Sequence, residues 1–258
     1  MNVYRGNVKL FFKGDNSLFY YFPLGEDLFN HSNNLIVNSA TLVSGNPIYK
    51  ARGFRSGNNS LFFNENIRIN INPSNIGMND FTSLIWFKVD KYNTENRYFY
   101  VFGHNSPVNS AHDFLIYKSD HSTYPGLIES NFWSNTLGTS TVRTTKRYDD
   151  NNWHLASVIR KRPDYLAILI DGKDFYLSTT SVNAAIYSGN SRDSVGYHRE
   201  FVLGYMRGYL SDYAMFSRVL SPQEIKSYYQ WATGQKKLFF FPLKTLNTAI
   251  IRRRLLIK

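Results

Sequence analysis

The sequence has no cysteine, comparatively few acidic residues and no long apolar run. Without cysteine the chain can form no disulfide, no thiolate metal site and no cysteine nucleophile, and its redox compartment is left open. The longest apolar stretches, Leu166–Ile170 and Leu238–Leu243, are far shorter than the roughly 20 residues of a membrane-spanning helix. The opening residues Met1–Arg5 contain no long apolar segment, so we expect no secretory signal peptide.

The excess of positive charge is concentrated at the C-terminal end. Thirty lysines and arginines against 19 acidic residues give a formal net charge of +11. Residues 236–258 hold seven of the basic residues and no acid, so residues 1–235 carry 23 basic and 19 acidic residues, a net charge of 23 − 19 = +4. Because this segment also holds apolar runs that a free tail would rarely expose, we expect an arm that packs on its own domain or on a partner. Its candidate anchoring residues are Lys236, Lys237, Phe239, Phe241, Arg252, Arg253 and Arg254.

Aromatic residues and short apolar runs dominate the rest of the chain. Twenty Phe and 19 Tyr are too many for a disordered chain. Asn, Gly, Ser and Asp interrupt the apolar runs at short intervals, which is the pattern of strands joined by turns. Asp171-Gly172 predicts a tight hairpin, because glycine accepts a positive φ. The predicted strands are 8–13, 19–23, 35–38, 61–63, 68–71, 82–89, 98–103, 114–117, 126–131, 139–144, 154–160, 165–170, 173–178, 201–204 and 207–216.

One helix is predicted near the end of the balanced region. Ser221 is a suitable N-cap, Pro222 suits the first helical position, and Glu224 completes a capping box. Gly234 predicts the end of this helix. The apolar residues that would share one helix face are Ile225, Tyr228, Tyr229 and Ala232.

Several segments match the strand patterns of one family in order and spacing. Phe54–Phe62 resembles an early strand entry, F-x-G-x-x-x-x-L-x-F, and Phe81–Lys88 resembles a core strand, F-T-x-x-x-W-x-K. Asn152–Val158 resembles W-H-x-x-x-V, and Tyr165–Lys173 resembles the L-x-L-Y-V-D-G-K that follows it. Gly208–Ser221 resembles the closing strand that leads into the helix. Over about residues 15–235 the chain therefore resembles the LamG-like, concanavalin A-like jelly rolls.

This resemblance implies an all-β fold, a two-sheet antiparallel jelly-roll sandwich with one short C-terminal helix. We predict one domain over residues 1–235 and a basic, apolar extension over residues 236–258. Trp86 and Trp153 are expected in the core, His154 at the start of a strand, and Arg218 as a brace before the helix. Asp212 falls where the family carries an acidic pair, but Ser211 replaces the first acid, which weakens a calcium-binding role.

Catalytic signatures are missing from the sequence. Hydrolases of this fold resemble one another in a strand of the form Glu-x-Asp-x-x-Glu, and this chain has no such stretch. Asp149 and Asp150 are adjacent and would point to opposite sides of a strand, while Glu129 is isolated. His112 and His121 are expected in solvated polar loops and not as metal ligands. We therefore predict a non-enzyme without a metal or a cofactor.

A jelly roll without catalysis is expected to bind or to assemble. Sugar sites combine an aromatic platform with amide and carboxylate groups. Polar loops that offer both are predicted at 105–113, 119–125, 132–135 and 188–200. The aromatic residues expected to be exposed in them, and to bind a ligand, are Tyr124, Trp133, Tyr197 and His198.

Four features together decide how we rank the functions: one predicted domain over most of the chain, no expected signal peptide, no cysteine, and the basic, apolar arm. LamG-like jelly rolls resemble modules of virus and phage surface proteins, so we favour a virion decoration or fibre-type protein with a carbohydrate-adhesion role, whose partners are capsid or fibre subunits. A free-standing carbohydrate-binding, lectin-like module, extracellular or at a cell surface, is the alternative. Contact with nucleic acid through Arg252–Arg254, or with a membrane surface through the tail, ranks below both.

Overall fold

A computed structural model describes residues 8–24, 29, 31, 40–46, 48–52, 56–71, 80–91, 98–105, 110–117, 121–134, 137–179, 193–197 and 205–235. The arm at 236–258 and the strands predicted at 35–38 and 201–204 lie outside these ranges. The helices and strands are α1 (Val8–Phe11), β1 (Leu18–Phe22), β2 (Ala40–Ser44), β3 (Ile48–Arg52), β4 (Ser56–Asn64), β5 (Arg68–Ile71), β6 (Phe81–Lys88), β7 (Tyr98–Asn105), β8 (Ser110–Tyr117), β9 (Ile128–Ser134), β10 (Gly138–Arg143), β11 (His154–Lys161), β12 (Tyr165–Ile170), β13 (Asp174–Ser178), β14 (Asp193–Val195), β15 (Arg207–Phe216) and α2 (Pro222–Ala232).

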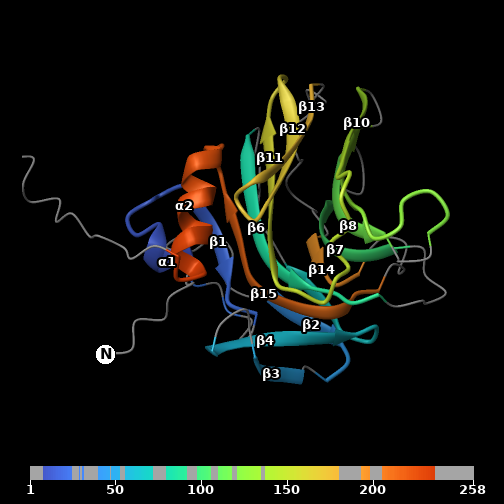
Figure 1. Cartoon of the computed structure of the whole chain (residues 1–258), viewed down its shortest axis with the longest axis vertical. Coiled ribbons are helices and arrows are strands. Elements are labelled where there is room, and N and C mark those ends of the chain that lie inside the picture. Colours follow the sequence, from blue (N-terminus) through green and yellow to red (C-terminus); the bar gives the residue numbers. More distant parts are fainter. Residues whose placement is uncertain are drawn as a thin grey trace, which may run out of the picture.

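The strands form two antiparallel sheets that face each other (Figure 1). The larger sheet has eight strands in the order β13-β12-β11-β6-β15-β4-β3, with β1 paired to β15. The smaller sheet has seven strands in the order β10-β9-β8-β7-β14-β5-β2. The predicted all-β, two-sheet sandwich is confirmed.

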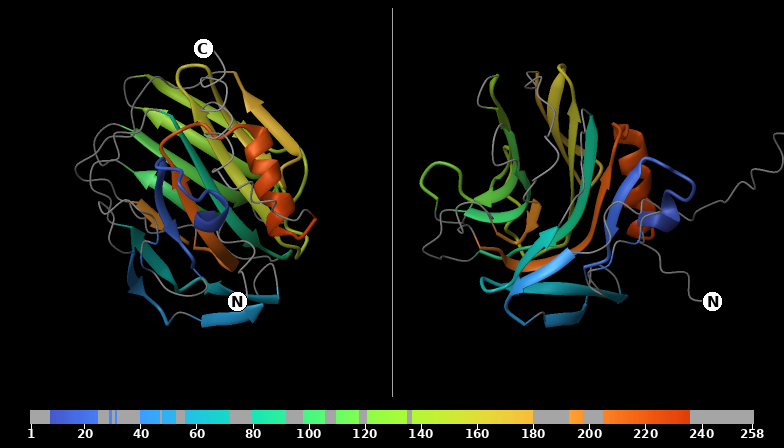
Figure 2. Two further views of the ribbon diagram at one scale, coloured as in Figure 1. Left: turned by 90° about the vertical axis from the view of Figure 1, so that its left-hand side faces the viewer. Right: turned by 180° about the vertical axis from the view of Figure 1, so that it is seen from behind.

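Two hydrophobic layers hold the sandwich together. The first lies between the sheets and includes Phe87 of the larger sheet and Phe114 and Phe132 of the smaller one. The second lies on the outer face of the larger sheet, under α1 and α2, which sit side by side (Figure 2). Trp86 is buried in this second layer, and its indole N–H donates to the Tyr228 hydroxyl at 3.2 Å. Trp153, also predicted as core, only packs against the edge of this layer and stays partly exposed.

The strand predicted at 8–13 is wrong, because α1 occupies residues Val8–Phe11 of it. Val8 and Phe12 are both buried in the outer layer. Residues four apart share one side of a helix and also one face of a strand, so this spacing alone does not separate the two. Phe12 packs against Phe216 at 4.8 Å between ring centroids, and Phe11 against Trp231 at 5.5 Å. Burial under α2 therefore selects the helical turn.

The predicted helix is confirmed as α2. The Ser221 side chain accepts from the backbone N–H of Glu224, and the Glu224 carboxylate accepts from the backbone N–H of Ser221 at 2.8 Å. Gly234 follows the last turn at a φ of +78°. Within the described residues no helix is long and apolar enough to cross a membrane.

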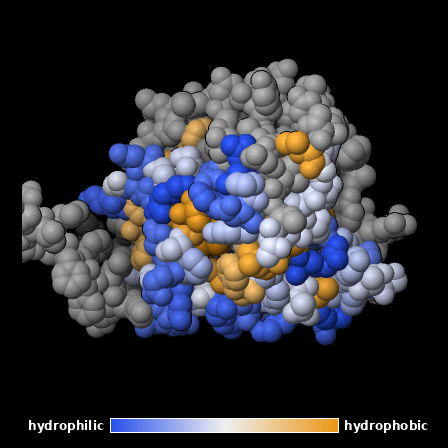
Figure 3. Space-filling model, turned by 90° about the horizontal axis from the view of Figure 1, so that it is seen from above, coloured by the Kyte–Doolittle hydropathy of each residue, from blue (hydrophilic) through white to orange (hydrophobic). Residues whose placement is uncertain are grey.

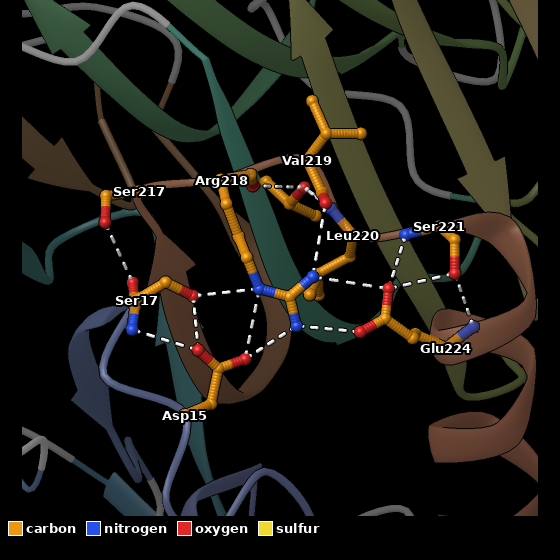
Figure 4. A network of polar contacts seen from close by, with 9 residues as sticks. Asp15, Ser17, Ser217, Arg218, Val219, Leu220, Ser221 and Glu224 are labelled. Atoms are coloured by element: carbon orange, nitrogen blue, oxygen red, sulfur yellow. Dashed lines mark hydrogen bonds and ion pairs between the residues drawn. The ribbon is translucent and has the colours of Figure 1, made fainter.

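Arg218 braces the chain before this helix, as predicted (Figure 4). Its guanidinium donates to the Asp15 carboxylate at 2.6 Å, to the Glu224 carboxylate at 2.7 Å and to the Val219 carbonyl at 3.2 Å. Its Nε also donates to the Ser17 hydroxyl at 3.0 Å. One side chain thus joins the turn before β1 to the start of α2.

The predicted hairpin between β12 and β13 is also confirmed. Asp171 and Gly172 both have positive φ angles, of 55° and 65°. The Asp171 carboxylate accepts from the backbone N–H of Leu155 at 3.0 Å and lies 2.9 Å from Nδ1 of His154. His154 opens β11, as expected, so this turn also fixes the start of the neighbouring strand.

Candidate ligand-binding face

The outer face of the smaller sheet carries a band of polar and aromatic side chains. Along β9, Ile128, Ser130 and Phe132 are fully buried towards the other sheet. Because side chains alternate along a strand, Glu129, Asn131 and Trp133 lie on the opposite, outer side. We call this surface the β8–β10 face. It comprises Asp113, Leu115, Tyr117, Glu129, Asn131, Trp133, Thr139, Thr141 and Arg143.

Strand register places these residues in cross-strand pairs. Trp133 is opposite Thr139, Asn131 is opposite Thr141, and Glu129 is opposite Arg143. The Thr141 hydroxyl donates to the Asn131 amide oxygen at 3.1 Å. Asp113 of β8 is opposite Asn131 on its other side. The middle of the face therefore presents hydroxyl, amide and carboxylate groups, with an ion pair at one end and a tryptophan at the other.

The ion pair at one end is tightly hydrogen-bonded. Arg143 donates from Nε to Oε2 of Glu129 at 2.7 Å and also bonds this oxygen through Nη2. The Tyr117 hydroxyl donates to the same oxygen at 3.0 Å. Burial raises the pKa of Tyr117 to about 12, and the Glu129 charge adds to this effect. Burial alone would lower the pKa of Arg143, but the Glu129 carboxylate outweighs it and raises that pKa. Tyr117 is therefore neutral and Arg143 charged at neutral pH.

The segment before β9 folds aromatic rings onto this ion pair. The Arg143 guanidinium lies 3.7 Å from the centre of the Tyr124 ring, a close cation–π contact. The His121 ring is nearly parallel to Tyr124 at 5.5 Å, and Tyr117 lies 5.2 Å from Tyr124. We call Tyr117, His121, Tyr124, Glu129 and Arg143 the aromatic corner.

His121 orders this segment through its ring. Its Nδ1 accepts from the backbone N–H groups of Thr123 at 3.2 Å and Tyr124 at 3.0 Å. Because Nδ1 is an acceptor in both bonds, the proton of the neutral ring is on Nε2. The aromatic corner is thus preorganised by bonds within the chain.

The far end of the face is apolar. Leu137, in the turn between β9 and β10, is 55% exposed, and Trp133 is partly exposed. Figure 3 looks down on the end of the sandwich where β10, β12 and β13 lie, and shows hydrophobic residues in separate patches among hydrophilic ones. Phe175 and Leu177, on the edge strand β13, are the corresponding exposed apolar residues of the larger sheet.

Two of the four predicted ligand-binding aromatics, Tyr124 and Trp133, lie on or beside this face. The exposure predicted for Tyr197 is wrong: it is only 4% exposed, and its hydroxyl donates to Asn70 of β5. His198 lies outside the described residues. Residues 132–134 of the loop predicted at 132–135 are instead the end of β9, so Trp133 is held by a strand, and residue 135 lies outside the described residues.

Sequence reasoning missed Tyr117 and Arg143 and judged Glu129 isolated. The available signal was the alternation of polar residues at 129 and 131 and again at 139, 141 and 143. The loop placement of His112 is also wrong, because this residue is fully buried in β8 with a ring nitrogen 2.8 Å from the Ser130 hydroxyl. Among the described residues there is no group of three His, Cys, Asp or Glu side chains that could hold a metal ion.

The family model for the concanavalin A-like lectin/glucanases superfamily matches residues 63–226. The chain belongs to this superfamily. No curated protein sequence matches the chain.

Solved structures share the superfamily fold at low sequence identity. One is domain 4 of AbnA, an extracellular arabinanase from Geobacillus stearothermophilus, in complex with arabinotriose. It is 13% identical to this chain with a TM-score of 0.59, and the alignment covers 83% of this chain and 98% of that domain. The binding domain of botulinum neurotoxin DC in complex with SialylT is 11% identical with a TM-score of 0.62, covering 84% of this chain. The binding domain of Paraclostridial Mosquitocidal Protein 1 is 14% identical with a TM-score of 0.64, covering 83% of this chain. The chain spans about half the length of these two toxin domains, 52% of each.

Proposed function

We propose that the chain is a non-enzymatic carbohydrate-binding module that holds a short oligosaccharide along the β8–β10 face. The observation that carries this proposal is the Arg143 guanidinium on the Tyr124 ring at 3.7 Å, beside Glu129 and on the same sheet face as Trp133. Aromatic rings pack on the C–H faces of sugars, and preorganised charged and amide groups bond their hydroxyls.

The dimensions of the face suit an extended ligand. Glu129 and Trp133 are four residues apart on one strand, which corresponds to roughly 13 Å at about 3.3 Å per residue. Asn131 and Thr141 lie between them in register. An oligosaccharide along β9 would therefore meet the aromatic corner, a hydroxyl and amide pair, and the tryptophan in turn.

The state of Glu129 supports binding over hydrolysis. Glycoside cleavage needs one carboxyl group that donates a proton and a second one nearby. Oε2 of Glu129 accepts hydrogen bonds from both Arg143 and Tyr117, so partners within the chain already occupy this oxygen. The similar domains in complex with arabinotriose and SialylT support sugar binding on this fold, and the extracellular arabinanase also supports the extracellular alternative over a virion.

A glycan array with the full chain tests the proposal, followed by titration of the best ligand. Trp133→Ala and Arg143→Met are expected to weaken binding about tenfold or more. The matched control is Phe175→Ala, which removes a 45% exposed aromatic ring from the other sheet. Equal affinity of all three variants, or release of reducing ends from a bound glycan, would contradict the proposal.

The virion role stays a prediction, as do the domain limits 1–235 and 236–258. Both depend on the basic arm, which lies outside the described residues. Light scattering on the full chain and on residues 1–235 tests them. If the arm is an assembly anchor, only the full chain should form larger species. If the shorter chain does not fold, the arm belongs to the domain.

A further inference from the structure

A polar pocket of about 390 Å³ lies on the outer face of the larger sheet, on the other side of the sandwich from the β8–β10 face. Leu61, Phe63 and Phe87 point into the core between the sheets. Because of strand alternation, Phe62 and Lys88 lie on the outer side. The pocket is lined by Phe62, Lys88, Asp90, Asn151, Arg207 and Tyr209, with Gly208 between the last two.

Three adjacent strands build the floor of this pocket. Tyr209 of β15 is in register with Phe62 of β4 on one side and with Lys88 of β6 on the other. The rings of Phe62 and Tyr209 are 4.8 Å apart, and Nζ of Lys88 lies 6.0 Å from the centre of the Tyr209 ring. The ring of Trp153 lies 6.2 Å from that of Tyr209. The floor is therefore an aromatic surface with a cation at its edge.

The pocket begins where the helical layer ends. Trp86, two residues before Lys88, is buried, and its ring is stacked on Tyr229 of α2 at 5.7 Å. Lys88 is only partly buried and Asp90 is exposed. Asn151 adopts a φ of +63°, and its backbone N–H donates to the Val89 carbonyl at 2.8 Å, which holds this loop against the pocket.

The charges of the pocket define the ligand. Lys88 and Arg207 contribute two positive charges and Asp90 one negative charge, an excess of one positive charge. This excess matches a single carboxylate better than a multiply charged phosphate. Arginine binds a carboxylate through its planar fork, and lysine adds a point charge. Asp90 and Asn151 offer partners for hydroxyl groups, and Tyr209 offers a face for a sugar ring.

We propose that this pocket is a second site, which binds the carboxylate-bearing ring of an acidic sugar. The carboxylate lies between Lys88 and Arg207, the ring packs on Tyr209, and the hydroxyls bond Asp90 and Asn151. The site is independent of the β8–β10 face, because the two surfaces share no residue.

Ligand-observed NMR on the full chain tests this with glucuronate as the probe, and with glucose and sulfate as comparisons. Glucuronate is expected to bind and glucose to bind at least about tenfold more weakly, because it lacks the carboxylate. Lys88→Met and Arg207→Gln should each weaken glucuronate binding by about tenfold. Lys173→Met, which removes an exposed lysine from the β12–β13 hairpin, is the matched control and should leave binding unchanged.

Three results would overturn the proposal. These are equal binding of glucose and glucuronate, sulfate binding as tight as that of glucuronate, or equal affinities in the Lys88→Met variant and the Lys173→Met control. Lys88 lies at the edge of the pocket floor and is only partly buried. The Lys88→Met variant therefore still tests the proposal if Arg207→Gln lowers the melting temperature. Trp133→Ala should leave glucuronate binding intact. A result against this second site can therefore be told apart from a result against sugar binding on the β8–β10 face.

Discussion

Nη2 of Arg218 lies 2.6 Å from Oδ2 of Asp15, although more than two hundred residues separate them in the chain. The same nitrogen lies 2.7 Å from Glu224 in the capping box of α2. Removal of this guanidinium should therefore loosen the turn before β1 and the start of α2 together. Arg218→Ala is expected to lower the free energy of unfolding by about 1 to 2 kcal/mol, because the side chain is 35% exposed and solvent screens part of the interaction. Urea denaturation measures this loss.

Arg218→Lys is the matched variant, because it keeps the charge and loses the planar fork. Its free energy of unfolding should lie between those of the wild type and Arg218→Ala. Hydrogen bonds from Arg218 lower the pKa of Glu224. Burial alone would raise the pKa of Asp15, but bonds from Arg218 and Ser17 outweigh it and lower that pKa. Both carboxylates therefore stabilise the fold above their ordinary pKa values, and this stability is lost as the pH falls. If Arg218→Ala lost stability with falling pH in the same way as the wild type, the link between Arg218 and these two carboxylates would be contradicted.

Gly172 should be intolerant of a side chain. At its φ of +65°, an added Cβ would lie 2.7 Å from the Cα of Lys226 in α2, so hairpin and helix would have to separate. Gly138 has a similar φ of +87°, with no atom within 4 Å of an added Cβ. Gly138→Ala should cost about 1 kcal/mol from backbone strain alone, and Gly172→Ala should cost at least about twice that. Thermal denaturation compares them, and equal losses would contradict the close packing.

His154 should make stability depend on pH near neutrality. Its ring nitrogens lie 2.9 Å from Asp171 and 3.0 Å from Asp150. Burial works against the charged ring, but the two carboxylates outweigh it and raise the pKa of His154 above its ordinary value of 6.5. The stabilisation is therefore complete below about pH 6.5 and is lost as the pH rises through the folded-state pKa. We expect the melting temperature to fall over this range, and His154→Gln to abolish that fall. If the melting temperature of His154→Gln still fell over this pH range, another titrating group would be responsible.

Arg160 and Phe132 should be energetically coupled. The Arg160 side chain is fully buried, and its guanidinium carbon lies 3.7 Å from the centre of the Phe132 ring. Burial lowers the pKa of Arg160 to about 9, and the nearby Arg162 charge adds to this effect. The face of the Phe132 ring attracts the guanidinium charge and so offsets part of the free energy that burying this charge costs. A double-mutant cycle with Arg160→Met and Phe132→Leu should give a coupling free energy of about 1 to 2 kcal/mol. Strictly additive losses would exclude the contact as a source of stability.

Local patterns predicted the elements whose structure depends on near neighbours. The capping residues of α2, the hairpin at Asp171 and Gly172, and strands such as β12 follow from backbone preferences and alternation. Elements without such a pattern were missed. Strands β2, β3 and β14 were not predicted, and α1 was assigned as a strand because its apolar run fits either period.

The sequence by itself determined the fold class, the capped helix and the alternation that separates core from surface, because each depends on residues close together in the chain. Only the tertiary structure decided which surfaces exist. Tyr197 is buried because β14 pairs with both β5 and β7, and Arg143 meets Tyr124 because β10 lies beside β9. The Tyr209 pocket likewise needs β4, β15 and β6 side by side. Such neighbours are selected by burial of the whole core, which no single stretch of sequence encodes.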